Sequence, residues 1–202
     1  MKTLVVTGLI GSGKSAVCAL LERRGIPVYN ADERTKRLYD RRPSLVSRLE
    51  KVLGVPLRRA DGSLDRQALS GVIFRDAAAR EKLEALVYPL VLQDFKRWRA
   101  RQKEAPFVVL ESAVILSKPL FDSLADAVVL VSAPEPLRLQ RVMERDGLPE
   151  TAVRARMQAQ SIPEEKVDVV LTNEGGFQQL SQAVEQVFFD NNSYICKLIN
   201  KQ

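Results

Sequence analysis

The sequence of 202 residues contains no histidine. This absence excludes mechanisms that need a histidine general base, a Ser–His pair or a histidine metal ligand. In an enzyme of this composition, proton transfer falls to a carboxylate, a lysine, a tyrosine or water. Any catalytic hypothesis has to be built on those groups.

Cysteine is scarce, and long apolar runs are missing. The two thiols, Cys18 and Cys196, lie far apart in the sequence and make neither a disulfide framework nor a metal site. We interpret Cys18 as a small buried residue of a helix, and we expect a reducing, cytoplasmic setting. No apolar run approaches the ~20 residues that span a bilayer, and the first strand begins at once. We therefore expect no signal peptide and no membrane partner.

Neither sign of charge dominates, since 31 Lys and Arg stand against 25 Asp and Glu, a net charge of +6. A basic balance suits either nucleic acid or a polyanionic small molecule. The arginines are spread over many segments instead of forming one basic tail, which favours the small molecule. We expect no nucleic-acid partner, and a monomer or weak oligomer.

One motif near the start organises the chain, GLIGSGKS at residues 8–15. It fits the phosphate-binding pattern of a glycine, four residues and Gly-Lys-Ser/Thr. An apolar strand-like run at residues 3–7 precedes it, and a helical pattern at residues 16–21 follows. The alternatives are a glycine-rich turn without a ligand and a dinucleotide-binding loop, and the glycine spacing does not suit the second.

The motif predicts a site for ATP. The glycines let the backbone wrap around an anion with its N–H groups inward, and the helix start adds its positive end. Lys14 should reach the β- and γ-phosphates, while the Ser15 hydroxyl should bind a magnesium ion. The residues expected to contact ATP in this loop are Gly11, Ser12, Gly13, Lys14, Ser15 and Ala16.

Further apolar runs at residues 28–30, 107–110, 127–131 and 168–172 complete an α/β pattern. We predict a P-loop NTPase fold, a five-stranded parallel sheet flanked by helices. Ligands of such sheets bind at the carboxyl ends of the strands.

Polar residues follow three of these strands. Asp32 comes after the second strand, either on the rim beside the phosphate loop or only as a helix cap. Glu111 ends the third strand, where an acid that organises magnesium is expected. Asn173 follows the fifth strand, in a loop where an adenine ring could lie.

Two helical segments interrupt the sheet pattern. Residues 36–103 form an insertion that lies on the acceptor side or is only a structural helical pair, and Pro89 should kink it. Residues 134–162 suggest a lid, in which Arg141 and Arg145 share a helix face and can neutralise the transferred phosphoryl group. The alternative is a solvated basic face. We expect a single kinase domain over residues 1–190 and a loosely held tail at 191–202.

No guanine-binding Asn-Lys-x-Asp motif is present, which disfavours a GTPase. From Leu4 to about Leu180 the chain resembles the dephospho-CoA kinase family. Blocks in the same order carry this resemblance: residues 7–15, Asn30-Ala31-Asp32 in place of Asp-Ala-Asp, and residues 62–66, 83–89, 141–147, 156–160, 165–166 and 173–175.

The resemblance implies ATP-dependent phosphorylation of the ribose 3′-hydroxyl of dephospho-CoA, the last step of coenzyme A synthesis. It implies that Asp32 orients or deprotonates that hydroxyl and that Arg141, with Arg145 beside it, binds ATP phosphates. Arg66 becomes a candidate on the acceptor side. Tyr88 stands where the family usually has histidine.

The proposed catalytic residues are therefore Asp32, Lys14 and Arg141, with ATP and Mg²⁺ as cofactors and a small-molecule acceptor. Residues 113–118 also depart from the segment that the family tends to have after its third strand. Two alternatives stay open: another P-loop kinase that acts on a nucleoside or small alcohol, and a protein that binds ATP without catalysis.

Overall fold

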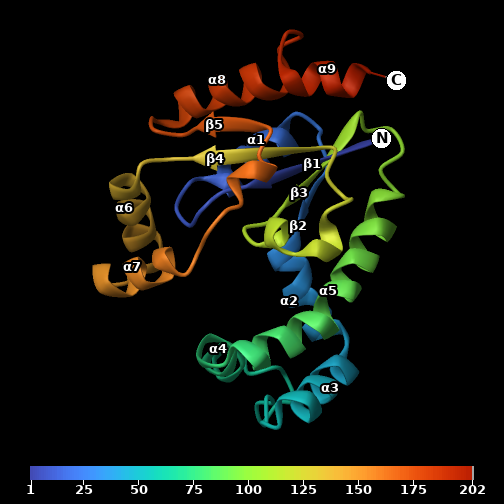
Figure 1. Cartoon of the computed structure of the whole chain (residues 1–202), viewed down its shortest axis with the longest axis vertical. Helices are drawn as coiled ribbons and strands as arrows, with labels where there is room; N and C mark the ends of the chain where they lie inside the picture. Colours follow the sequence, from blue (N-terminus) through green and yellow to red (C-terminus); the bar gives the residue numbers. More distant parts are fainter. Residues whose placement is uncertain (202) are drawn as a thin grey trace. The chain divides into compact units, whose positions relative to one another are not determined.

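The computed structural model describes residues 1–201, which divide into two compact units (Figure 1). One comprises Met1–Asn30 together with the chain from Gln102 onward, and we call it the sheet unit. The other, Ala31–Arg101, is the helical unit. No helix among residues 1–201 is long and apolar enough to cross a membrane.

A parallel sheet forms the centre of the sheet unit. Its five strands within the described residues are β1 (Lys2–Thr7), β2 (Val28–Asn30), β3 (Phe107–Glu111), β4 (Ala127–Ser132) and β5 (Val169–Thr172). They lie in the order β2-β3-β1-β4-β5, and every neighbouring pair is parallel. The predicted five-stranded parallel sheet is confirmed.

The strands form where apolar residues run almost without interruption, because both faces of a parallel sheet are covered. All five residues of β3 are buried, and so are five of the six residues of β1. The last strand begins one residue later than expected. Asp168 precedes it and accepts a hydrogen bond from the backbone N–H of Val128 at 2.8 Å, which ties the start of β4 to the neighbouring segment.

Helices cover one face of this sheet. They are α1 (Lys14–Arg23), α8 (Phe177–Phe188) and α9 (Tyr194–Asn200), and Figure 1 shows α8 and α9 following one another along one side. The main core packs them against alternate strand residues such as Leu4, Val6 and Val129. The expected loose tail at 191–202 is wrong for the described part, since α9 forms there and Ile195 is fully buried.

The expected lid region contains two helices, α6 (Glu135–Asp146) and α7 (Glu150–Gln158). Gly147 ends α6 with a φ of 64°, a left-handed conformation that favours glycine. The two helices share a small core of their own, formed by Leu139, Val142 and Val153. Short 3₁₀ turns complete the unit: η1 (Ile115–Ser117), η2 (Pro119–Phe121) and η3 (Glu164–Lys166).

The helical unit consists of α2 (Ala31–Arg41), α3 (Pro43–Leu53), α4 (Arg66–Arg75) and α5 (Ala77–Arg99). Asp65 and Asp76 cap α4 and α5, each accepting two backbone N–H bonds of the helix it precedes. Pro89 lies inside α5, and Figure 1 shows this helix changing direction along its length, as expected for a residue without an N–H donor. That this insertion binds the acceptor stays a prediction.

Candidate active site

The phosphate loop joins β1 to α1. The backbone N–H of Ser12 donates to the Leu9 carbonyl at 3.1 Å and closes a turn, and α1 begins at Lys14. The Lys14 ammonium donates to the Gly8 carbonyl at 2.8 Å, which folds this side chain back over the loop. The first turn of α1 carries no acidic residue, so nothing on the helix opposes an anion at its positive end.

Two loop glycines are required by shape as well as by conformation. Gly11 has a φ of 79°, and a Cβ there would lie 2.5 Å from the carbonyl oxygen of Arg138. Gly13 has a φ of 96°, and a Cβ there would lie 2.1 Å from Nδ2 of Asn173. Any other side chain would meet both backbone strain and a collision.

Asn173 joins the phosphate loop to the expected lid. Its side chain is buried and donates to the Ser12 carbonyl at 2.8 Å. Arg141 donates to the Asn173 backbone carbonyl at 3.2 Å and to its side-chain oxygen at 3.4 Å. The structure therefore brings Asn173, Arg141 and the loop together, with the Asn173 amide engaged inside the protein. Contact of Asn173 with an adenine ring stays a prediction.

Glu111 lies beside the start of α1. The Ser15 hydroxyl donates to one carboxylate oxygen at 2.7 Å, and the Asn30 amide donates to the other at 2.8 Å. Burial raises the pKa of the neighbouring Cys18 thiol, and the charge of Glu111 raises it further. The structure thus brings together the two residues expected at magnesium, Ser15 and Glu111, and adds Asn30.

These oxygen donors suit a hard cation such as Mg²⁺, which typically takes one or two protein carboxylates and completes its coordination with phosphate and water. Within residues 1–201, no group of three or more Cys, Asp or Glu side chains is placed to hold a metal ion without such help. The residues present fit a metal that arrives with a nucleotide.

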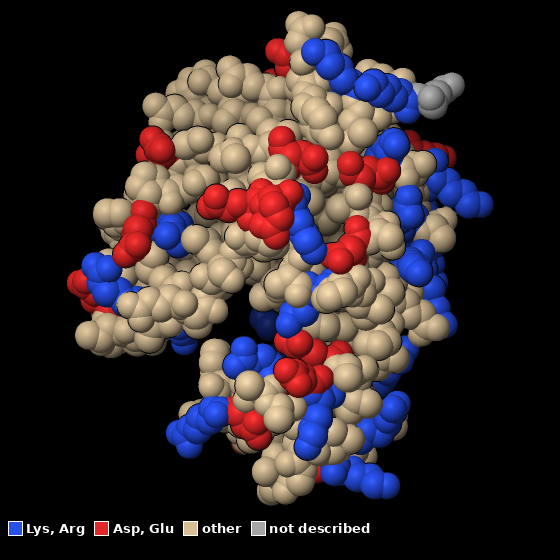
Figure 2. Space-filling view, viewed as in Figure 1, with Lys and Arg blue, Asp and Glu red and all other residues tan. Residues whose placement is uncertain are grey.

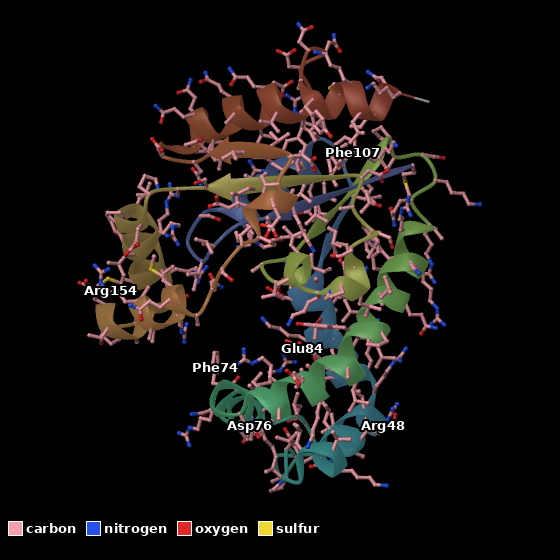
Figure 3. All side chains as sticks on the ribbon, viewed as in Figure 1. Arg48, Phe74, Asp76, Glu84, Phe107 and Arg154 are labelled. Carbon is pink, nitrogen blue, oxygen red and sulfur yellow. The ribbon has the colours of Figure 1, made fainter. Side chains whose placement is uncertain are left out.

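The lid arginines differ from one another in their partners. Arg145 forms two hydrogen bonds with Asp146, at 2.7 and 3.1 Å, and it lowers the pKa of that carboxyl. Arg154, labelled in Figure 3, pairs with Glu150 and with Glu135 and so joins α7 to the start of α6. Of the two arginines expected at ATP, the structure places Arg141 next to the phosphate-loop contacts and Arg145 on a local acid.

Asp32 lies in the first turn of α2, two residues after the last residue of β2. The helix already starts at Ala31, so Asp32 is not its N-cap. Its charge also acts on Tyr88, which is therefore near it in the helical unit.

Burial raises the pKa of Tyr88, and Glu84 raises it further by its charge and by accepting the tyrosine hydroxyl at 3.3 Å (Glu84 is labelled in Figure 3). Tyr39, which is buried nearby, also has its pKa raised by burial, to about 12. Both tyrosines remain protonated near neutral pH and can act as hydrogen-bond donors.

Arg66 is the first residue of α4 and is held by α2. Its guanidinium donates to both carboxylate oxygens of Asp40, at 2.8 and 3.1 Å, and to the Lys36 carbonyl at 3.3 Å. The charge of Arg66 acts on Tyr39 as well. Asp32, Tyr88 and Arg66 thus belong to one connected part of the helical unit.

Cavities in the sheet unit do not all belong to this chemistry. One of about 520 Å³ is lined by Val5, Leu110 and Val128 on the sheet face away from α1, and no phosphate-loop residue lines it. A smaller cavity of about 210 Å³ includes Leu9, Ser12 and Arg138 in its lining. Of the residues expected to contact ATP, only Ser12 lines this smaller cavity. Figure 2 shows acidic side chains gathered on the viewed face of the sheet unit, although the chain is basic overall.

Comparison with known proteins shows which family the chain belongs to. The family model described as dephospho-CoA kinase matches residues 3–179. The chain belongs to the dephospho-CoA kinase family. It is 39% identical over 160 residues to a dephospho-CoA kinase from Porphyromonas gingivalis, covering 79% of this chain and 78% of that one. It is 36% identical over 194 residues to one from Frankia casuarinae, covering 94% and 83%.

The fold agrees with this assignment to the dephospho-CoA kinases. A crystal structure of TT1252 from Thermus thermophilus superposes with a TM-score of 0.78 at 36% identity, covering 91% of this chain and 94% of that one. Members of the family are phosphotransferases that use a nucleotide and act on an alcohol group, in the final step of coenzyme A biosynthesis. Family membership therefore favours the kinase interpretation over binding without catalysis.

Several residues that contact the phosphate loop or Glu111 are not among the site residues predicted from the sequence. Arg138 is buried and donates to the Ala133 carbonyl at 3.1 Å, while Gln160 accepts the backbone N–H of Ile10 at 2.7 Å. Asn30 and Gln160 both belong to blocks that carry the family resemblance, but neither is predicted as a site residue. The signal for Arg138 was its place one turn before Arg141 on α6, whereas nothing local to Gln160 indicates its partner.

Proposed function

We propose that this chain transfers the γ-phosphoryl group of ATP to the ribose 3′-hydroxyl of dephospho-CoA, with Lys14, Arg141 and Asp32 as its catalytic residues. The observation that carries the proposal is the preformed phosphate loop, with Lys14 folded over it and Arg141 tied to it through Asn173.

ATP binding is assigned to the backbone of the loop, from Gly11 to Ala16. The left-handed glycines turn the loop backbone so that its N–H groups can face an anion at the start of α1, while those of Ser12 and Ala16 donate to the Leu9 and Gly13 carbonyls. Lys14 exchanges its bond with the Gly8 carbonyl for the β- and γ-phosphates. Arg141 supplies positive charge where negative charge develops during transfer. Arg145 can add a second positive charge there when its hydrogen bonds to Asp146 break.

The acceptor hydroxyl is assigned to Asp32. A carboxylate is one of the groups that can act as general base in a chain without histidine, and it can orient the hydroxyl and take its proton as the new P–O bond forms. Tyr88 contributes a hydrogen-bond donor in place of the family's histidine. Arg66 offers a cation for the anionic acceptor, although Asp40 competes for it.

Magnesium is assigned to Ser15 and Glu111, on the basis of their oxygen donors. A magnesium ion held there would reduce the negative charge of the ATP phosphates. Glu111 orients the Ser15 hydroxyl, and Asn30 holds the other oxygen of Glu111. We further propose that the protein works in the cytoplasm as a monomer or weak oligomer, without nucleic-acid or membrane partners.

The test is an ADP-release assay with ATP, magnesium and a panel of acceptors: dephospho-CoA, adenosine and glycerol. We expect turnover with dephospho-CoA alone, formation of coenzyme A by mass spectrometry, and no activity in the Lys14→Ala variant. Turnover with adenosine or glycerol but not with dephospho-CoA would instead support a different P-loop kinase. ADP binding without transfer to any acceptor would overturn the proposal.

A further inference from the structure

The lid segment engages Ile10 of the phosphate loop by its side chain and by its backbone. Its side chain packs against the small core that α6 and α7 share, alongside Leu148 and Met157. Its backbone N–H donates to Oε1 of Gln160 at 2.7 Å, and its carbonyl lies 3.5 Å from the guanidinium of Arg138. Side chain, donor and acceptor of a single loop residue are thus all engaged by the lid segment.

The contact with Gln160 has a specific mechanical effect. The trans peptide between Leu9 and Ile10 is planar, so its N–H and C=O point in opposite directions. The N–H is held by Gln160, and the Leu9 carbonyl accepts the N–H of Ser12 at 3.1 Å. With both ends bonded, this peptide plane cannot rotate. It lies between Gly8 and Gly11, where the backbone would otherwise turn most freely.

We propose that Gln160 is a positioning residue for nucleotide binding, which fixes the phosphate loop by accepting the N–H of Ile10. It touches neither reactant in this scheme. Its effect reaches ATP through the orientation of the Leu9–Ile10 peptide and makes the end of the lid part of the phosphate site. The inference rests on the assignment of the loop to ATP but does not depend on the identity of the acceptor.

The chain offers a matched control. Gln158 is the last residue of α7, two positions before Gln160, and its side chain is exposed to solvent. Gln158→Ala removes the same atoms from the same segment without touching the loop. Gln160→Glu keeps an acceptor oxygen at the same reach, so it should restore the bond to Ile10 that Gln160→Ala removes.

Two measurements test the proposal. Amide hydrogen exchange of Ile10, followed without nucleotide, should be slow in the wild type, in Gln158→Ala and in Gln160→Glu, and roughly ten-fold faster or more in Gln160→Ala. Calorimetric titration should show the Kd of ADP raised about 2- to 10-fold by Gln160→Ala and unchanged by Gln158→Ala, the range that one net hydrogen bond gives.

Fast exchange of the Ile10 amide in the wild type would overturn the proposal. This measurement needs no variant, so it stays decisive even if Gln160→Ala fails to fold. An unchanged ADP affinity in a folded Gln160→Ala variant would overturn it too, since Gln160 would then be merely structural. Failure of the chain to phosphorylate dephospho-CoA would count against the proposed function but would leave both results interpretable, because neither measurement uses the acceptor.

Discussion

Gly11 shows how sharply single residues constrain this site. Its backbone is in the left-handed conformation, which strains any residue with a side chain. A Cβ added to it would also lie only 2.5 Å from the carbonyl oxygen of Arg138. Gly25, with a φ of 77° and nothing within 4 Å of an added Cβ, has only the first. Substitutions at Gly25 and Gly11 therefore distinguish the effect of backbone strain alone from the effect of strain together with a steric clash.

We expect Gly25→Ala to cost about 1 kcal/mol of unfolding free energy and to leave ADP binding intact. Gly11→Ala should destabilise the protein further and remove measurable ADP binding, because a backbone oxygen cannot move aside. Urea unfolding and calorimetry check both statements. Equal behaviour of the two variants would show that the Arg138 contact has no bearing on the loop.

Asn30 provides a second residue-scale prediction. Its amide donates to Glu111, so Asn30→Asp would place two carboxylates next to each other at a hydrogen-bond distance of 2.8 Å. We expect a lower Tm without metal, and a larger rise of Tm on addition of Mg²⁺ with ADP than in the wild type. Asn191→Asp makes the same chemical change at an exposed position and serves as control. Identical shifts in both variants would contradict the role of Asn30.

At this scale the sequence predicted what is local. The spacing of GLIGSGKS was enough to identify Lys14 and Ser15, whose positions follow from the loop itself. It could not predict the hydrogen bond between Ile10 and Gln160 or the closeness of Arg138 to Gly11, because these contacts join residues more than a hundred positions apart. Nor could it predict that the Asn173 side chain donates to the Ser12 carbonyl.

Among the elements, α9 differs most from expectation. The polar run Asp190 to Ser193 predicted the end of ordered structure, yet Ser193 accepts the N–H of Cys196 at 3.0 Å and caps a new helix. Residues that favour a break and residues that favour a cap are the same types, so composition alone could not distinguish them.

We predict that Ile195→Ala lowers the unfolding free energy by about 2–5 kcal/mol, since this side chain is fully buried in the main core. Tyr194→Ala, at a half-exposed neighbouring position, should cost much less. Urea denaturation monitored by circular dichroism checks this. A loss below that of Tyr194→Ala would mean that α9 contributes little to the core.

Glu50 near the end of α3 gives a prediction about pH. Its carboxylate accepts the N–H of Leu57 at 2.9 Å and pairs with Arg58, and these bonds lower its pKa from the ordinary value of 4.5. Because the folded-state pKa is the lower one, the stabilisation is complete above pH 4.5 and disappears as the pH falls through the folded-state value.

Glu50→Gln should therefore be less stable than the wild type at pH 7, and the difference should shrink at acid pH. Glu81→Gln, at an exposed position on α5, should follow the wild type throughout. Thermal unfolding from neutral to acid pH tests this. A difference that stays constant across the range would exclude ionisation of Glu50 as its source.

For the molecule as a whole, the sheet was predictable because buried parallel strands appear as nearly unbroken apolar runs. Because the strands are parallel, the sequence also predicted that the phosphate loop lies at the edge formed by their carboxyl ends. The start of the helical insertion was harder to predict from the sequence. The helix α2 begins directly after Asn30, and no turn residue separates it from β2. The cluster of Tyr39 with Tyr88 and Asp32 depends on how α2 and α5 pack, which periodicity does not specify.

The net charge of +6 also belongs to this scale. If it serves two polyanionic substrates, the KM for both ATP and dephospho-CoA should rise with added salt while kcat changes little, because the Debye length shrinks to about 10 Å at 0.1 M. Steady-state kinetics at several NaCl concentrations measure this. A KM independent of salt for both substrates would exclude long-range attraction as the purpose of the basic surface.

The most direct test of the account is the turnover of Asp32→Asn with ATP and dephospho-CoA, measured together with its affinity for ADP. We predict that kcat falls on the order of 10²-fold or more while the Kd of ADP stays at the wild-type value, because Asp32 acts on the acceptor hydroxyl and the phosphate loop is untouched. Wild-type turnover in this variant would contradict the assignment of the catalytic carboxylate.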